Sequence, residues 1–187
     1  MNDFLRLVVI FFAAVNPAAV AASVLRLEHA GDDRLRVRLP VAAAVIAAAV
    51  FALACWSAPH LLDWLDIAPE SFRVAAGIVM ATMGVIVIVF GAITTDTDRI
   101  GLGGAAFPLA VPLLAGPAGL MAAVSYSADD GFGKAFGAVA IIVAATAVLL
   151  IARLERARPM VGGIARVTGA LLVAVAAGLV VSGVRDI

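Results

Sequence analysis

The chain has 187 residues, of which 64% are hydrophobic and 14% charged, and its 13 basic residues balance its 13 acidic residues. Soluble domains average about 45–50% apolar and about 25% charged residues, so this chain lacks the polar residues that a water-exposed surface needs. Disorder is excluded too, because it requires low hydrophobicity and high net charge. A net charge of zero gives no reason to expect nucleic acid binding. The single cysteine, Cys55, forms neither an intramolecular disulfide nor a cysteine metal cluster.

Six segments free of Asp, Glu, Lys and Arg follow one another along the chain. Each is within or above the range of about 17–25 residues that a helix needs to cross the hydrocarbon core of a bilayer. Strict alternation of apolar and polar residues, the pattern of a membrane β-barrel, is absent. We therefore predict an all-α membrane protein with six transmembrane helices. The segments are 7–25, 39–62, 74–95, 100–128, 135–152 and 167–184.

Basic residues divide unequally between the two sides of this six-helix arrangement. Nine lie in or beside the connections after the first, third and fifth helices, and four lie on the opposite side. Because short cytoplasmic loops are enriched in Lys and Arg, we expect the side with nine to face the cytoplasm and both termini to face the periplasm of a bacterial inner membrane. The nine are Arg26, Arg34, Arg36, Arg38, Arg99, Arg153, Arg156, Arg158 and Arg166, and the four are Arg6, Arg73, Lys134 and Arg185.

The two halves of the chain share an ordered set of short matches. Asn16-Pro17 in the first helix corresponds to Gly116-Pro117 in the fourth, and Phe72-Arg73 before the third corresponds to Ala165-Arg166 before the sixth. Three helices per half is an odd number, so the second half enters the membrane from the opposite side. We therefore predict two inverted three-helix repeats, 1–95 and 96–187, within one membrane domain, an architecture found in many secondary transporters. The alternative is a chance alignment of two alanine-rich segments.

The first and fourth helices are expected to break at Asn16-Pro17 and Gly116-Pro117. Asn is a good N-cap, and Pro is favoured at the first helical position, so each pair indicates a new helix start inside the membrane. Such a start leaves backbone N–H groups unpaired and carries partial positive charge, so two starts meeting near the midplane would suit one carboxylate. The alternative is that the prolines only kink their helices. The expected substrate-binding residues are Asn16, Pro17, Ala18, Ala19, Ser23, Gly116, Pro117, Ala118, Gly119 and Ser125.

The ammonium group of a bound zwitterion is also expected to find hydrogen-bond acceptors at these breaks. The carbonyl groups that the prolines free, at Ala13 and Leu113, and the side-chain amide of Asn16 are predicted to accept its hydrogen bonds. Arg73 is expected to anchor its helix start or to pair with a carboxylate such as that of Glu70.

One stretch of the fourth helix, FPLAVPLLAGPA at 107–118, closely resembles the MarC family of bacterial inner-membrane proteins. The stretch FRVAAGI at 72–78 and the pair Asn16-Pro17 resemble two further segments of that family, whose six-helix layout matches the whole chain. The resemblance implies transport of small neutral amino acids, within the broader group of amino-acid exporters that includes LysE. The chain departs from the family's Asp-Pro-x-Gly-Asn in the first helix, where Asn16 replaces the aspartate that could contact an ammonium group or cation.

These observations predict a secondary transporter of small neutral amino acids or similar small zwitterions, working by alternating access. No carboxylate lies inside the six segments to carry a proton, which leaves Na⁺ at freed carbonyls or uncoupled transport. A small-solute channel and a non-transporting scaffold are the alternatives. The small-residue stripe Ala170, Ala174, Gly178 and Ser182 is expected to be a packing surface and leaves a homo-oligomer open.

An enzyme is not expected, and neither is a cofactor or a metal. A serine protease needs a base beside its nucleophile, and we expect His29 and His60 to lie in connections between helices. A thiol oxidoreductase needs two cysteines, and metal hydrolysis needs a cluster of histidines and carboxylates. The chain has one cysteine and two histidines.

Overall fold

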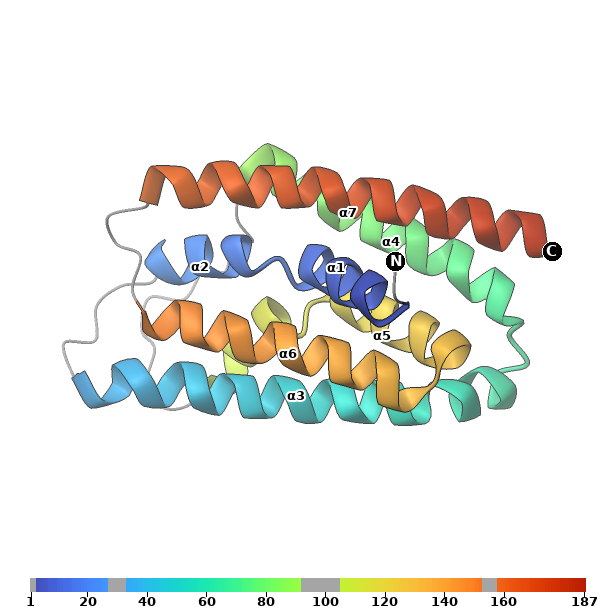
Figure 1. The fold of residues 1–187 in the computed structure, drawn as a ribbon, viewed down its shortest axis with the longest axis horizontal. Helices are drawn as coiled ribbons and strands as arrows, with labels where there is room; N and C mark the ends of the chain where they lie inside the picture. The colour runs from blue at the N-terminus through green and yellow to red at the C-terminus, as the bar shows by residue number, and fades with distance from the viewer. Residues whose placement is uncertain (1–2, 27–32, 92–104, 153–157) are drawn as a thin grey trace.

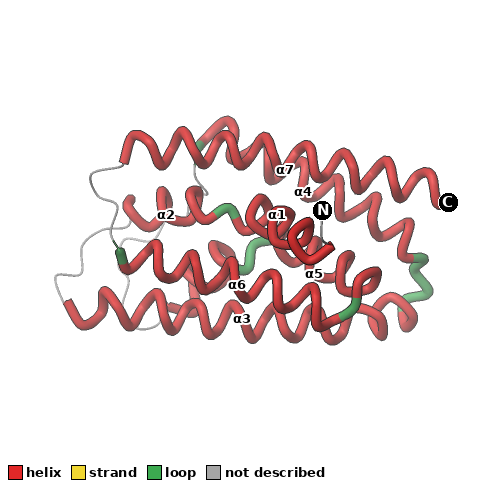
Figure 2. Tube along the Cα trace, in the orientation of Figure 1, coloured by secondary structure: helices red, strands yellow, loops and turns green. Residues whose placement is uncertain are grey.

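The structure, a computed structural model, describes residues 3–26, 33–91, 105–152 and 158–187. Every regular element in these ranges is helical, which confirms the all-α prediction for this part of the chain (Figures 1 and 2). The helices are α1 (Asp3–Val15), α2 (Pro17–Arg26), α3 (Asp33–Trp64), α4 (Pro69–Phe90), the wide π-type helix η2 (Ala106–Leu114), α5 (Pro117–Asp130), α6 (Phe132–Ile151) and α7 (Arg158–Asp186).

Five helical stretches of the described residues are long and apolar enough to cross a membrane. The stretches are Asp3–Val24, Val37–Trp64, Pro69–Phe90, Phe132–Ile151 and Met160–Asp186. The first of them contains the break between α1 and α2.

The expected fourth span, 100–128, is not one continuous helix. Its described part is divided between η2 and α5, and the backbone leaves the helical region at Phe107 and Val111 within η2. Three prolines lie close together in this segment, Pro108, Pro112 and Pro117. Each lacks the backbone N–H that a continuing helix would use. Of the six spans that the sequence indicates, the described residues show four as unbroken helices, α3, α4, α6 and α7. The first is divided between α1 and α2, and the described part of the fourth is divided between η2 and α5.

Three layers make up the bundle (Figure 1). Helices α4 and α7 run antiparallel as one outer pair, and α3 and α6 run antiparallel as the other. The broken helices lie between the pairs, because α1 and α2 contact both α6 and α7, and α5 contacts both α3 and α4. The central position shows in burial as well: 67% of the most apolar part of Asp3–Val24 is buried, against 28–39% for the other four stretches.

Backbone contacts hold the outer pair α4–α7 together. A Cβ atom added to Gly77 would lie 2.9 Å from the carbonyl oxygen of Ala176, and one added to Gly84 would lie 2.9 Å from that of Gly169. Both distances are shorter than real Cβ contacts, so only glycine allows this approach. Small residues at such positions provide the close packing that joins helices in membranes, where the hydrophobic effect does not. The packing of α4 on α7 therefore depends on glycine at these two positions.

The small-residue stripe of the last helix lies on a different face of α7. Ala170, Ala174 and Gly178 are exposed, and a Cβ atom at Gly178 would meet no atom within 4 Å. The stripe therefore does not take part in the packing of α7 on α4.

Candidate functional site

The first helix breaks at the predicted position. Helix α1 ends at Val15, α2 begins at Pro17, and the residue between them, Asn16, has a left-handed backbone with φ 49°. Asn adopts this region more readily than most residues, since its short polar side chain bonds locally. Asn16 is 3% exposed, and Pro17 is buried, so this break lies in the interior of the bundle.

The side chain of Asn16 caps α2 and ties it to α7. Its Oδ1 accepts a hydrogen bond of 3.0 Å from the backbone N–H of Ala19 and one of 2.8 Å from the hydroxyl of Thr168. Its Nδ2 donates to the carbonyl oxygen of Ala165 at 3.1 Å. The predicted N-cap is confirmed. Two donors of the protein itself lie within hydrogen-bond distance of Oδ1, the amide oxygen expected to receive an ammonium group.

Thr168 has three acceptors within reach of one proton. Its hydroxyl lies 2.8 Å from Asn16 Oδ1, 2.8 Å from the carbonyl oxygen of Ile164 and 3.0 Å from that of Ala165. A hydroxyl donates to one acceptor at a time, so its bond to Asn16 competes with bonds to the backbone of α7 itself. Sequence reasoning missed Ala165 and Thr168 as partners of the break.

The second break differs from the first. Between η2 and α5 the backbone passes through Ala115 and Gly116, and Gly116 has extended torsions, φ −77° and ψ 166°. Gly116 provides no side-chain cap for α5, whose first residue is Pro117. A Cβ atom at Gly116 would lie 2.9 Å from the carbonyl oxygen of Pro112, so this close approach requires glycine. Pro117 itself is exposed, whereas Pro17 is buried.

The first turn of α5 lies beside the end of α1. A Cβ atom at Gly119 would lie 3.0 Å from the ring of Phe51 and 3.8 Å from the side chain of Val15, the last residue before the first break. From this central region α2 and α5 run toward opposite ends of the bundle (Figure 1). The first turn of α5 therefore lies next to the residue that precedes the first break.

The two helix starts differ in their unpaired donors. Among the described residues, the backbone N–H groups of Ala118 and Gly119 have no acceptor at the start of α5. At the start of α2 only the N–H of Ala18 lacks an acceptor in the same part of the chain, because Asn16 receives that of Ala19. The partial positive charge of a helix start is thus less compensated at α5 than at α2.

The two predicted serine residues lie in different environments. Ser23 donates a hydrogen bond of 2.8 Å to the carbonyl oxygen of Ala19 in its own helix. Ser125 is 2% exposed, and its hydroxyl has no partner among the described residues. Close by on α5, Ser127 donates to the carbonyl oxygen of Cys55 at 2.7 Å and thereby joins α5 to α3.

Two charged or polar residues outside the breaks are placed differently from the sequence expectation. His60 lies within α3 rather than in a connection, exposed, with its ring 6.0 Å from that of Trp56. Arg73 pairs with Asp129 and Asp186 rather than with Glu70. His29 lies outside the described residues.

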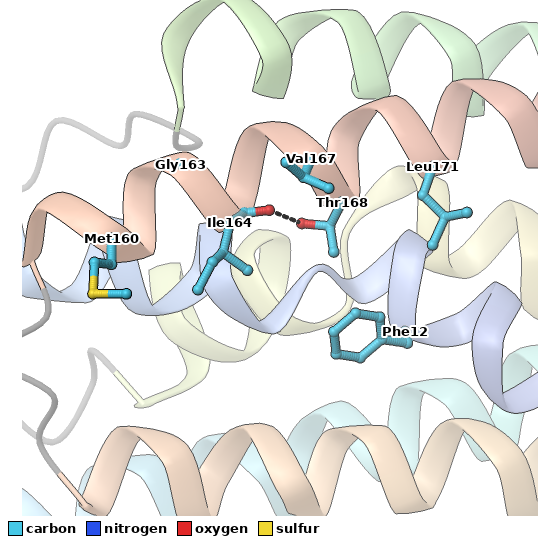
Figure 3. Close-up of a pocket in the computed structure, with 7 residues that line it drawn as sticks. All are labelled: Phe12, Met160, Gly163, Ile164, Val167, Thr168 and Leu171. Atoms are coloured by element: carbon cyan, nitrogen blue, oxygen red, sulfur yellow. Dashed lines mark hydrogen bonds between the residues drawn. The ribbon is translucent and has the colours of Figure 1, made fainter.

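An open groove of about 630 Å³ lies between α1 and α7, beside the first break (Figure 3). Its lining is apolar apart from Thr168, the residue that bonds to Asn16. The groove suits an alkyl group and gives no counter-charge to a zwitterion. It is lined by Phe12, Met160, Gly163, Ile164, Val167, Thr168 and Leu171.

Several apolar helices of membrane-crossing length, arranged around two broken helices, define an integral membrane protein. The profile of the family described as MarC family integral membrane protein matches residues 1–187, and the chain belongs to this family. The chain is 30% identical over 132 residues to the UPF0056 membrane protein PH0214 of Pyrococcus horikoshii. The aligned part is 68% of this chain and 65% of that protein, so the chain spans less than two thirds of the relative's length. No solved structure matches the chain.

Proposed function

We propose that this MarC family protein is a secondary transporter of small neutral amino acids or similar small zwitterions. The observation that carries the proposal is the start of α5, where the unpaired N–H groups of Ala118 and Gly119 lie beside the end of α1. Two adjacent N–H groups at a helix start are suited to a carboxylate. Since no Asp or Glu is needed at such a site, it is compatible with the absence of acidic residues from the six apolar segments.

The residues around the α5 start favour a small substrate. Ala18, Ala19, Ala115 and Ala118 are all buried and carry only a methyl group. The carboxylate would accept from the N–H groups of the α5 start, and the ammonium group would donate to the freed carbonyl oxygen at Leu113 or Ala13, both of which precede a proline by four residues. In this arrangement Asn16 and Pro17 hold the start of α2 in place rather than contact the substrate through the amide.

Alternating access follows from the inverted repeats 1–95 and 96–187. The opposite directions of α2 and α5 and their place between two pairs of long helices support this reading. One pair of long helices would rock relative to the other around the central helix starts. The unequal distribution of basic residues supports a bacterial inner-membrane location with both termini in the periplasm.

The proposal is tested by counterflow in proteoliposomes that contain the purified protein. Vesicles preloaded with unlabelled alanine should accumulate labelled glycine and alanine transiently, and labelled lysine and glutamate should stay outside. Counterflow distinguishes a carrier from the two alternatives. A small-solute channel gives flux without transient accumulation, and a scaffold gives no flux, and either result contradicts the proposal.

A further inference from the structure

Three charged side chains from three helices meet at the end of the bundle that carries the C-terminus. Arg73, near the start of α4, donates from Nη2 to Asp129 Oδ1 at 2.6 Å and from Nε to Asp129 Oδ2 at 3.0 Å. Its Nη1 donates to Asp186 Oδ2 at 2.8 Å. Asp129 lies in the last turn of α5, and Asp186 is the last residue of α7, so one guanidinium joins α4, α5 and α7.

The bond to Asp129 crosses from one layer of the bundle to another. Asp186 lies on α7, which is packed on α4 through Gly77 and Gly84, whereas Asp129 lies on α5 in the central layer, which contacts both α3 and α4. Arg73 therefore ties the end of α5 to the outer pair α4–α7. The two-pronged geometry is the strong form of an ion pair, and this one lies at the surface of the bundle, where 18% of the Arg73 side chain and 25% of the Asp129 side chain are exposed.

An unpartnered hydroxyl lies one helical turn inside this ion pair. Ser125 precedes Asp129 by four residues, so the two lie on the same face of α5, about 6 Å apart along its axis. The Ser125 side chain is 2% exposed, and its hydroxyl has no partner in the described part of the chain. Buried hydroxyls nearly always have a hydrogen-bond partner. Water or a polar solute that reaches Ser125 would satisfy this hydroxyl.

We propose that the ion pair of Arg73 with Asp129 is a latch that closes a water path from this end of the bundle to Ser125. When the latch opens, the end of α5 moves away from α4, and Asp186 keeps the guanidinium on the outer pair. The inference rests on the proposed transport function, in which the latch closes the end that we assign to the periplasm.

Cysteine accessibility tests the latch without any transported substrate. Ser125→Cys is introduced in a Cys55→Ala background, and its reaction rate with a membrane-impermeant, positively charged methanethiosulfonate is measured in intact cells. With the latch intact we expect slow labelling. Arg73→Gln and Asp129→Asn should each raise the rate about fivefold, which is the shift in an opening equilibrium expected on loss of a partly shielded ion pair.

The two variants control for each other. Arg73→Gln removes a positive charge and Asp129→Asn a negative one, so a purely electrostatic effect on the charged reagent would change the rates in opposite directions. Lys134→Gln serves as the matched control, since Lys134 is a basic residue at the same end and has no ion pair among the described residues. Its rate should stay well below that of Arg73→Gln, because the loss of one positive charge is common to both variants and only Arg73→Gln opens the latch.

Fast labelling of Ser125→Cys with the latch intact would overturn the proposal. So would unchanged rates in Arg73→Gln and Asp129→Asn proteins that elute as folded species in detergent, because a merely structural ion pair would alter stability alone. If these variants do not fold, Arg73→Lys decides, since it keeps the charge and loses the two-pronged geometry. We expect about a twofold higher rate for it, and an unchanged rate contradicts the latch. Failure of the counterflow assay leaves these rates unaffected, so the two failures are distinguishable.

Discussion

The two helix breaks carry similar sequences and lie in different surroundings. At the first, Asn16 adopts a left-handed backbone, caps α2 and bonds to two residues of α7. At the second, Gly116 is extended and gives α5 no side-chain cap. A residue before a proline therefore starts a new helix in both places, and its side chain decides whether that start is tied to a neighbouring helix or left with unpaired donors.

Removing the anchor of the first break should have the largest effect on stability. Asn16→Ala leaves the N–H of Ala19 without its acceptor, removes the bonds of Asn16 to Ala165 and Thr168, and places alanine at a φ of 49°. Loss of a cap and of buried hydrogen bonds predicts a destabilisation of about 2–4 kcal/mol. Thermal unfolding in detergent measures it.

Asn16→Ser is the matched control for that change. It is neutral, keeps a capping oxygen for the N–H of Ala19 and loses the donor to Ala165, so its loss of stability should be clearly smaller. Equal losses for alanine and serine would contradict the capping role of Asn16.

At the second break, Gly116→Ala should lower stability by a smaller amount, and for a purely steric reason. In Gly116→Ala the new methyl group would lie 2.9 Å from the carbonyl oxygen of Pro112, so η2 and α5 must shift. Overpacking of this kind costs about 1–3 kcal/mol. Gly163→Ala is the control, because a Cβ atom there meets no atom within 4 Å. A Gly116→Ala protein as stable as the Gly163→Ala protein would show that the approach to Pro112 relaxes freely.

The smallest effect is expected at Thr168. Thr168→Val keeps the shape of the side chain and removes one hydrogen bond to Asn16, while Asn16 Oδ1 still accepts from Ala19. Stability should fall by about 1 kcal/mol. In an Asn16→Ala background the same change should have almost no effect, and a double-mutant cycle on unfolding temperatures measures this coupling. Additive losses would mean that the bond to Asn16 does not form.

The positions of the two helix breaks could be predicted from the sequence because they depend on local chemistry. The contacts between distant helices could not, because they depend on long-range packing. The missing N–H of proline and the capping ability of Asn16 fix where α2 and α5 begin, and both act over a few residues. Ala165 and Thr168 lie 149 and 152 residues from Asn16, so their role depends on how α7 packs. The pairing of Arg73 with Asp129 and Asp186 depends in the same way on the arrangement of three helices.

The division of the fourth span shows a second limit. Each proline in 108–117 signals a local break, but their joint outcome, the π-type helix η2 followed by a short α5, depends on the surrounding helices. The same holds for the exposure of Pro117, which the sequence does not distinguish from the burial of Pro17.

The central claim is that the uncapped start of α5 binds the substrate. The most direct test compares the rate of alanine counterflow in two variants, Ala118→Pro and Ala118→Ser. Proline in the first turn of a helix removes one N–H and is tolerated there, whereas serine keeps the N–H at similar size. Loss of one hydrogen bond to a charged group predicts at least about a tenfold lower rate for Ala118→Pro and a rate near that of the parent for Ala118→Ser. Equal rates in two folded variants would contradict the claim.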